Sequence, residues 1–315
     1  MCRIGMIDLD RKTQSKVFPN LPLMKISAWH KLKGDTVEWY DGTHFDKVYV
    51  AKVFSFSPDY VGEIDADEIV YGGSGFCTEV VDGKEVYHIE LDTPLPYHIE
   101  HIYPDYSLYG IKDTAYGFLS RGCPRNCEFC HVSQMQGRKP HQVAQLNEFW
   151  NGQKNIVLLD PNITSCKDWK EMFQELIDSK ASVTFSQGID IRALNDEKID
   201  MLMQIKLRDI HIAWDRYEDG EIIKPLLKRF KEKTGLDKQR CTVYILCNFD
   251  TTFEQDLERA EYVRNMRLQP YIMIYNKPSV KRGNELNKLA RWINWKPFCW
   301  SFDSFEEYRK VMYKC

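Results

Sequence analysis

The sequence predicts an α/β protein in which a partial (βα)6 barrel of the TIM type follows a small Rossmann-like α/β domain. Six strand-like runs recur between residues 116 and 275 at intervals of about 30 residues, the repeat length of βα units. Apolar residues at helical spacing lie between these runs. The segment before residue 110 also alternates between strand and helix patterns, but its elements are shorter.

The six expected barrel strands are short, apolar runs that are followed by polar residues. They are residues 116–119, 155–159, 182–186, 209–214, 242–247 and 270–275. Helices are expected over 167–180, from Asn195 to about 205, and from 250 to about 266, where Thr251 and Thr252 precede Glu254 as capping residues. The tail after Lys281 predicts a further helix. The predicted domains are therefore 1–110, 111–280 and 281–315.

In the N-terminal segment, strands are expected over 4–9, 47–56 and 68–71, and a helix over 22–33, with proline near its start and Gly34 after its end. This alternation predicts a small Rossmann-like sheet. The run Gly72-Gly73-Ser74-Gly75 lacks the GxGxxG pattern followed by a helix, so we interpret it as a turn and not as a phosphate-binding loop. Residues 76–110 are expected to form a connector.

Composition excludes some classes of protein. The chain has 315 residues, of which 43 are basic and 46 acidic, so its net charge of −3 offers no general attraction for nucleic acid. No apolar run approaches the roughly 20 residues that span a bilayer, and the N-terminus lacks a signal-peptide core. We therefore expect a cytoplasmic protein without membrane contact.

Cys123, Cys127 and Cys130 form a CxxxCxxC pattern on a loop directly after the first expected barrel strand. Three thiolates on one loop can face a single point, whereas a cubane iron–sulfur cluster normally takes four, so one iron would keep an open position. Zinc usually takes two CxxC pairs, or CxxC with a histidine pair, and scattered cysteines in a reducing compartment disfavour disulfides. The other seven cysteines show no second cluster spacing, so one cluster is expected.

With Phe129 at the aromatic position, this loop resembles the CxxxCxΦC motif of radical S-adenosylmethionine (SAM) enzymes. The resemblance implies a [4Fe–4S] cluster on the three cysteines whose open iron binds the amino and carboxylate groups of SAM. It also implies reductive cleavage of SAM to a 5′-deoxyadenosyl radical that abstracts hydrogen from a substrate. The implied partners are SAM and an electron donor such as flavodoxin or ferredoxin.

Residues 18–24 and 69–75 resemble the cobalamin-binding-like domain that precedes some radical SAM barrels. This domain is short, however, and it lacks the DxHxxG segment that supplies a cobalt-ligating histidine. We therefore do not expect cobalamin to bind, and we interpret the domain as a degenerate scaffold or substrate platform.

Polar residues just past the expected strands are candidates for ligand binding, because ligands of βα barrels gather at the carboxyl ends of the strands. The resemblance assigns Asp160 and Asn162 to the amino end of SAM and Asp215 to its ribose hydroxyls, with Gln187 as a neighbour. The alternative for each residue is a helix cap or an ordinary loop hydrogen bond. The segment 137–139 resembles a basic segment of methylthiotransferase-like members and could bind the SAM carboxylate, bind a phosphate or be solvated.

The predicted function is therefore radical SAM chemistry on a substrate that the sequence does not identify. Modification of RNA or a nucleotide and modification of a peptide both stay open, although the negative net charge does not favour nucleic acid. The alternative is a non-enzymatic iron–sulfur protein that transfers electrons or senses redox state. The repeated βα units with polar strand ends argue against it, because an electron carrier needs no SAM-sized cavity.

Overall fold

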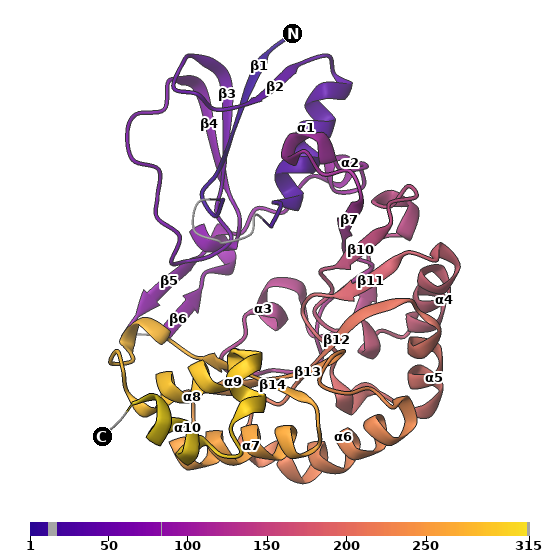
Figure 1. Ribbon diagram of the computed structural model, residues 1–315. Helices are drawn as coiled ribbons and strands as arrows, with labels where there is room; N and C mark the ends of the chain where they lie inside the picture. Colours follow the sequence, from indigo (N-terminus) through magenta and orange to yellow (C-terminus); the bar gives the residue numbers. More distant parts are fainter. Residues whose placement is uncertain (12–17, 83, 314–315) are drawn as a thin grey trace. The chain divides into compact units, whose positions relative to one another are not determined.

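A computed structural model describes residues 1–11, 18–82 and 84–313. The chain divides into two compact units, Met1–Val157 and Leu158–Cys315. The framework consists of two parallel sheets, one of four strands and one of six (Figure 1). The domain boundaries expected near residues 110 and 280 stay predictions.

The four-stranded sheet contains β1 (Arg3–Asp8), β2 (Thr36–Trp39), β3 (Phe45–Ala51) and β4 (Ala66–Gly72). Its order is β2-β1-β3-β4, and every neighbouring pair is parallel. Strand β2 was not predicted, because its four residues are half-buried or exposed and carry no apolar run.

One face of this sheet is covered by α1 (Leu21–Leu32), with α2 (Tyr97–Glu100) beside it. Asn20 begins α1 as its N-cap by accepting a 3.1 Å hydrogen bond from the Leu23 amide. Ile4 and Met6 of β1 pack with Leu23 and Ile26 of α1 in one apolar cluster. The helix is therefore held by its inner apolar side.

The opposite face of the same sheet carries Ile7, Phe45, Val48 and Val50. It is met by residues 52–65, which connect β3 to β4 and which, although all are described, contain no helix. After β4 the chain turns through a short 3-10 helix (Ser74–Phe76), as the glycine pattern predicted. An antiparallel hairpin, β5 (Thr78–Val81) and β6 (Lys84–Tyr87), follows in the segment that was expected to be only a connector.

The six-stranded parallel sheet contains all six expected strands, with bounds shifted by one or two residues. They are β7 (Thr114–Gly117), β10 (Asn155–Leu158), β11 (Ser182–Phe185), β12 (Leu207–Ala213), β13 (Cys241–Cys247) and β14 (Gln269–Ile274). Their spatial order follows their order in the chain. Two short strands, β8 (Ser120–Arg121) and β9 (His141–Gln142), pair separately.

Helices separate the strands of the second unit, as the apolar spacing predicted. They are α4 (Trp169–Ser179), α5 (Asp196–Gln204), α6 (Gly220–Thr234) and α7 (Phe253–Asn265), and the tail forms α8 (Glu285–Asn294), α9 (Lys296–Ser301) and α10 (Phe305–Met312). Figure 1 shows α4 to α7 following one another along the outer side of strands β11 to β14. All helices of this series therefore lie against the same face of the sheet.

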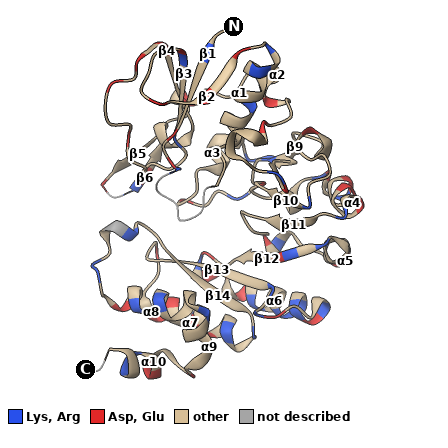
Figure 2. Ribbon diagram, turned by 45° about the horizontal axis from the view of Figure 1, so that its top comes forward, with Lys and Arg blue, Asp and Glu red and all other residues tan. Residues whose placement is uncertain are grey.

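The outer surfaces of these helices are charged and of mixed sign. Basic and acidic residues follow one another along α6 (Figure 2), and Arg229 and Lys233 of that helix pair with Asp196 and Asp200 of α5. Within the described part of the chain, no helix is both long enough and apolar enough to cross a membrane.

Candidate functional site

The three motif cysteines lie on a loop that is closed at its base. Strands β8 and β9 pair antiparallel at that base, with Ser120 opposite Gln142 and Arg121 opposite His141. Just inside the pair, the Cys123 amide donates a 3.1 Å hydrogen bond to the carbonyl oxygen of Gly137. The loop therefore begins and ends at the β8–β9 pair, and all three cysteines lie between these two strands.

Gly122, directly before the first cysteine, is required by this closure. Its φ is +89°, a conformation that residues with a side chain rarely adopt, and a Cβ there would lie 2.9 Å from the carbonyl oxygen of Lys139. The two passes of the chain at the base can approach each other because this residue has no side chain.

Cys123, Cys127 and Cys130 are half-buried, as is Phe129, and none of the nine described cysteines is in a disulfide. The Cys130 amide donates a 3.0 Å hydrogen bond to the Cys127 carbonyl oxygen, so these two cysteines share one tight turn. The short helix α3 (Val132–Gln136) begins two residues later. The structure thus places the three predicted ligands on one loop that is closed at its base and partly buried.

The β5–β6 hairpin packs beside this loop through His131. The imidazole stacks on the Tyr87 ring at 5.9 Å between centroids, and its Nε2 lies 3.8 Å from the Glu85 carboxylate. That nitrogen is buried and makes no hydrogen bond. His131, which directly follows Cys130, is thus partly covered by a hairpin that the sequence did not predict.

The chemistry of the donor set can be compared with two kinds of metal site. Tetrahedral zinc takes four ligands that converge on a single ion, whereas a cubane cluster takes each thiolate on a different iron. Among the described residues, no three His, Cys, Asp or Glu side chains are placed to hold one metal ion. Cys123, Cys127 and Cys130 are half-buried thiols on one closed loop, and thiolates are the residue type that iron–sulfur clusters use.

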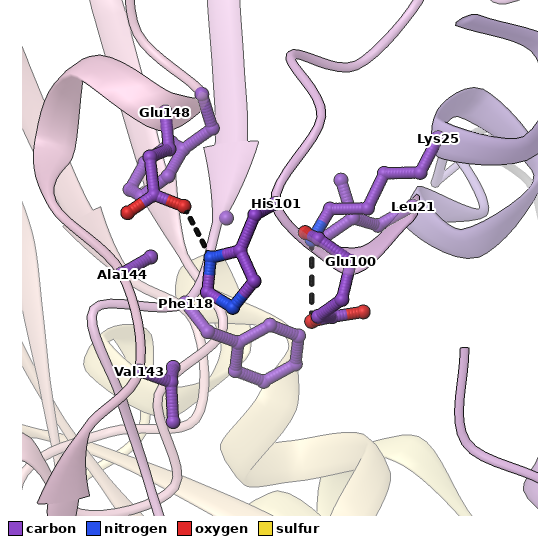
Figure 3. A pocket seen from close by; sticks show the side chains of 10 residues that line it. Leu21, Lys25, Glu100, His101, Phe118, Val143, Ala144 and Glu148 are labelled. Carbon is purple, nitrogen blue, oxygen red and sulfur yellow. Dashed lines mark hydrogen bonds and ion pairs between the residues drawn. The ribbon is translucent and has the colours of Figure 1, made fainter. Parts of the chain in front are cut away.

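The base of the cysteine loop is tied to the N-terminal helices by charged side chains around a small pocket (Figure 3). Lys25 of α1 donates to the Glu100 backbone oxygen and pairs with the Glu100 carboxylate at 3.2 Å. The same carboxylate accepts a 2.9 Å hydrogen bond from Arg121 of β8. Burial lowers the pKa of Lys25. His101 and Glu148 form a second pair at 2.7 Å.

In the second unit, polar side chains from the ends of three successive strands form one hydrogen-bonded network. Asn162 after β10 donates to the Asp190 carboxylate after β11 at 3.4 Å. The Asp190 carboxylate in turn accepts a 2.8 Å hydrogen bond from Arg192. Arg192 also donates a 2.7 Å hydrogen bond to Asp219, which follows β12. The carboxyl ends of the strands therefore bring their polar residues together, as parallel pairing predicts.

The candidate SAM-binding residues occupy different environments within this unit. Asp160 and Asn162 are buried, with 4% and 3% of their surface exposed. Burial raises the pKa of Asp215 to about 6, against the opposing effect of the nearby Arg259 and Arg192. Gln187 is exposed at the turn after β11 and takes no part in the Asn162–Asp219 network.

Arg259 of α7 organises the ends of β12 and β13, and sequence reasoning missed it. The side chain is fully buried and donates to the backbone oxygens of Trp214 at 2.9 Å, Asp215 at 2.8 Å and Leu246 at 2.7 Å. It also binds the Asp256 carboxylate at 2.6 Å. The one available signal was the Asp-x-x-Arg spacing, which puts both side chains on one side of a helix.

Along β12 to β14, the residues that alternate with the buried aliphatic residues are polar or aromatic, and they form one face of the sheet. It carries Asp209 and His211 on β12, Tyr244 on β13 and Tyr271 on β14. His211 stacks on Tyr244 at 4.9 Å, and Tyr244 meets the edge of Tyr271 at 5.6 Å. Asp209 Oδ1 and His211 Nδ1 are buried without a hydrogen bond. Branched aliphatic side chains fill this position in a closed barrel, so this face is built differently.

Comparison with known proteins adds no family to these observations. No protein-family model matches the chain, and a search of curated proteins found no match. The closed cysteine loop, the polar strand ends and the polar sheet face are therefore the features that bear on function.

Proposed function

We propose that this protein is a radical SAM enzyme, in which Cys123, Cys127 and Cys130 hold a [4Fe–4S] cluster that binds SAM. The observation that carries the proposal is the closed cysteine loop, which follows the first strand of a parallel sheet whose strands are ordered as in the chain. That strand order, with helices on one face, supports a partial βα barrel, because a doubly wound sheet would reverse direction.

The residues of the chain have separate tasks in this proposal. The three thiolates hold the cluster, which when bound would supply the electron that cleaves SAM. Asp160 and Asn162 accept hydrogen bonds from the SAM amino group, and the Asp215 carboxylate accepts from the ribose hydroxyls, for which an acceptor-only group is suited. Gln187 has less support, since it lies outside the network of strand ends.

The polar sheet face favours an enzyme over an electron carrier. Asp209, His211 and Tyr244 offer unsatisfied hydrogen-bonding atoms and an aromatic surface, which suit a bound substrate. An electron carrier needs neither. A substrate with a planar, hydrogen-bonding group fits these side chains, and the proposal leaves nucleotides and peptides as the two classes to test.

The test is anaerobic reconstitution with iron and sulfide, followed by reduction with dithionite in the presence of SAM. We expect about four irons per chain, the content of one cubane cluster, and the appearance of 5′-deoxyadenosine and methionine by mass spectrometry. Cys127→Ala should lose both the iron and the cleavage products. Cys2→Ala removes an exposed thiol outside the loop and should change neither.

Two results would contradict the proposal in different ways. Iron and sulfide that load without any SAM cleavage would leave an iron–sulfur protein of the electron-transfer or sensing kind. Full iron content in Cys127→Ala would overturn the ligand assignment. For the SAM contacts, Asp160→Ala should raise the SAM concentration needed for half-maximal cleavage while iron loading stays normal.

A further inference from the structure

The four-stranded sheet leaves one of its faces incompletely covered, for a topological reason. From β1 the chain passes through α1 to β2 on one side, whereas β3 leads to β4 on the other. Right-handed crossovers in opposite directions lie on opposite faces of a parallel sheet. The second crossover, residues 52–65, contains no helix although all of it is described, so it cannot fill its face as α1 fills the other.

A cavity of about 480 Å³ lies between this loop and the sheet. Val50 of β3 and Ile69 of β4 line its sheet side, and Tyr60 and Ile64 line its loop side. Tyr71 and Phe76 meet edge to face at 5.4 Å between centroids and complete an aromatic wall. This volume is within the roughly 300–1,000 Å³ range of small-molecule sites.

The cavity contains one buried cation. Only 9% of the Lys52 side chain is exposed, and its ammonium lies 5.4 Å from the centre of the Phe76 ring. Its ion-pair partner, Asp59, is 74% exposed and comes from the loop, at 2.8 Å. The Asp59 carboxylate is mostly in water and loses little by leaving the pair, whereas the buried Lys52 ammonium needs an anionic partner. A ligand that supplies an anion can therefore take the place of Asp59.

Two glycines allow the turn after β4 to pack directly against Lys52. A Cβ on Gly73 would lie 2.4 Å from the Lys52 carbonyl oxygen, and one on Gly75 would lie 2.7 Å from the Lys52 side chain. The turn after β4 therefore packs directly on Lys52, which holds this residue at the edge of the cavity. Lys52 also lies at the carboxyl end of β3, beside β1, where the strand order reverses direction. Open α/β sheets bind ligands at such points.

We propose that this cavity is a second ligand site, which binds a small aromatic molecule carrying one anionic group. The ring packs between the aliphatic sheet side and Tyr60, Tyr71 and Phe76, and the anion pairs with Lys52 after displacing Asp59. The site lies wholly within the N-terminal unit, and its existence does not depend on radical SAM chemistry.

The probes are three small molecules that separate the two parts of the proposal. Indole-3-acetate carries both a ring and an anion, indole-3-acetamide has the ring alone, and hexanoate has the anion alone. Titration calorimetry on the full chain should show saturable binding of indole-3-acetate. Because a charge-assisted hydrogen bond is lost with the amide, we expect that probe to bind about tenfold more weakly, and hexanoate should bind more weakly as well.

Three variants test the named residues. Lys52→Met should weaken indole-3-acetate binding by about tenfold, whereas Lys47→Met, which removes a lysine of β3 that lies outside the cavity lining, should leave it unchanged. Asp59→Asn removes the competing carboxylate and should strengthen indole-3-acetate binding by about two- to fivefold, with no gain for the amide. Ile69→Phe fills the cavity and should abolish binding.

The Asp59→Asn result keeps the test informative even if another variant fails to fold, because misfolding cannot strengthen binding. Failure of all three probes to bind, equal affinity for the carboxylate and the amide, or unchanged binding by Lys52→Met would each overturn the proposal. None of these outcomes depends on iron loading or SAM cleavage, so the test is separate from that of the cysteine loop.

Discussion

The faces of the two parallel sheets are covered by different kinds of connecting segment. In the six-stranded sheet every strand follows its predecessor in space, and helices α4 to α7 lie on one face, so the other face carries polar and aromatic side chains. In the four-stranded sheet the chain reverses direction at β1, both faces receive crossovers, and the loop crossover leaves a cavity. Chain connectivity thus decides which face of each sheet is covered by helices.

Each sheet also has a buried charged anchor at its carboxyl edge, and the two anchors have opposite charge. Arg259 donates to backbone oxygens beyond β12 and β13. Asp10, just after β1, accepts from the backbone amides of Val53 and Phe54 and from the Ser57 hydroxyl, at the start of the 52–65 loop. In one sheet a helix is fixed to strand ends, and in the other a loop is fixed.

The largest expected effect is at Arg259. Arg259→Met removes a fully buried guanidinium and leaves the Asp256 carboxylate, which is 1% exposed, without its partner. Because an uncompensated buried charge is strongly unfavourable, we expect a loss of about 3–5 kcal/mol in the free energy of unfolding. Urea denaturation followed by circular dichroism measures it.

The matched control is Arg229→Met, which removes an arginine of α6 that pairs with Asp196 at the surface. Its effect should be about 0–1 kcal/mol. Equal effects of the two variants would show that the Arg259 contacts do not hold the ends of β12 and β13.

A smaller loss is expected when the anchor of the other sheet is removed. Asp10→Ala removes a buried carboxylate that accepts from two backbone amides and from the Ser57 hydroxyl, and we expect a loss of about 2–3 kcal/mol in the free energy of unfolding. Since the loop forms one wall of the cavity, indole-3-acetate binding should weaken too.

Asp67→Ala, at an exposed position on β4, is the control for Asp10→Ala and should change neither stability nor binding. If Asp10→Ala destabilised the protein while the remaining folded fraction bound indole-3-acetate with unchanged affinity, the loop would hold its position without this anchor.

The sequence predicted most of the strands but neither of the two buried charged residues, Arg259 and Asp10, that bind the strand ends and the loop. The six strands of the larger sheet were found because each is an apolar run, which marks a strand that is buried on at least one face. Strand β2 and the β5–β6 hairpin were missed because most of their side chains are half-buried or exposed. Short partly exposed strands carry little apolar signal.

The site shows a similar limit. The cysteine spacing predicted the loop as a cluster site, and the ends of the expected strands predicted Asn162 and Asp215 as candidate ligand-binding residues, because both signals are local in the sequence. Arg259 and Asp10 bind backbone atoms, which every residue has, so no residue type marks their partners. Whether a strand-end residue joins a network also depends on folding: Asn162 does and Gln187 does not.

The smallest expected effect concerns the pH dependence of stability at Asp215. Its pKa is about 6 in the folded protein, above the ordinary value of 3.8, chiefly because burial disfavours the charged carboxylate. The folded state therefore holds this proton more tightly than the unfolded chain. The contribution of Asp215 to stability is greatest below about pH 4 and is lost as the pH rises through 6.

Asp215→Asn has no such proton to lose, so it should gain stability relative to the wild type between pH 4 and pH 7. We expect a gain of about 1–2 kcal/mol, since one pKa unit corresponds to about 1.4 kcal/mol and the partial exposure of the side chain reduces the effect. Urea denaturation of both proteins across this range gives the difference directly. If the stability of the wild type instead rose relative to that of the variant with increasing pH, the effect of Arg259 and Arg192 on the pKa of Asp215 would be larger than that of burial. The folded protein would then favour the ionised carboxylate at this position.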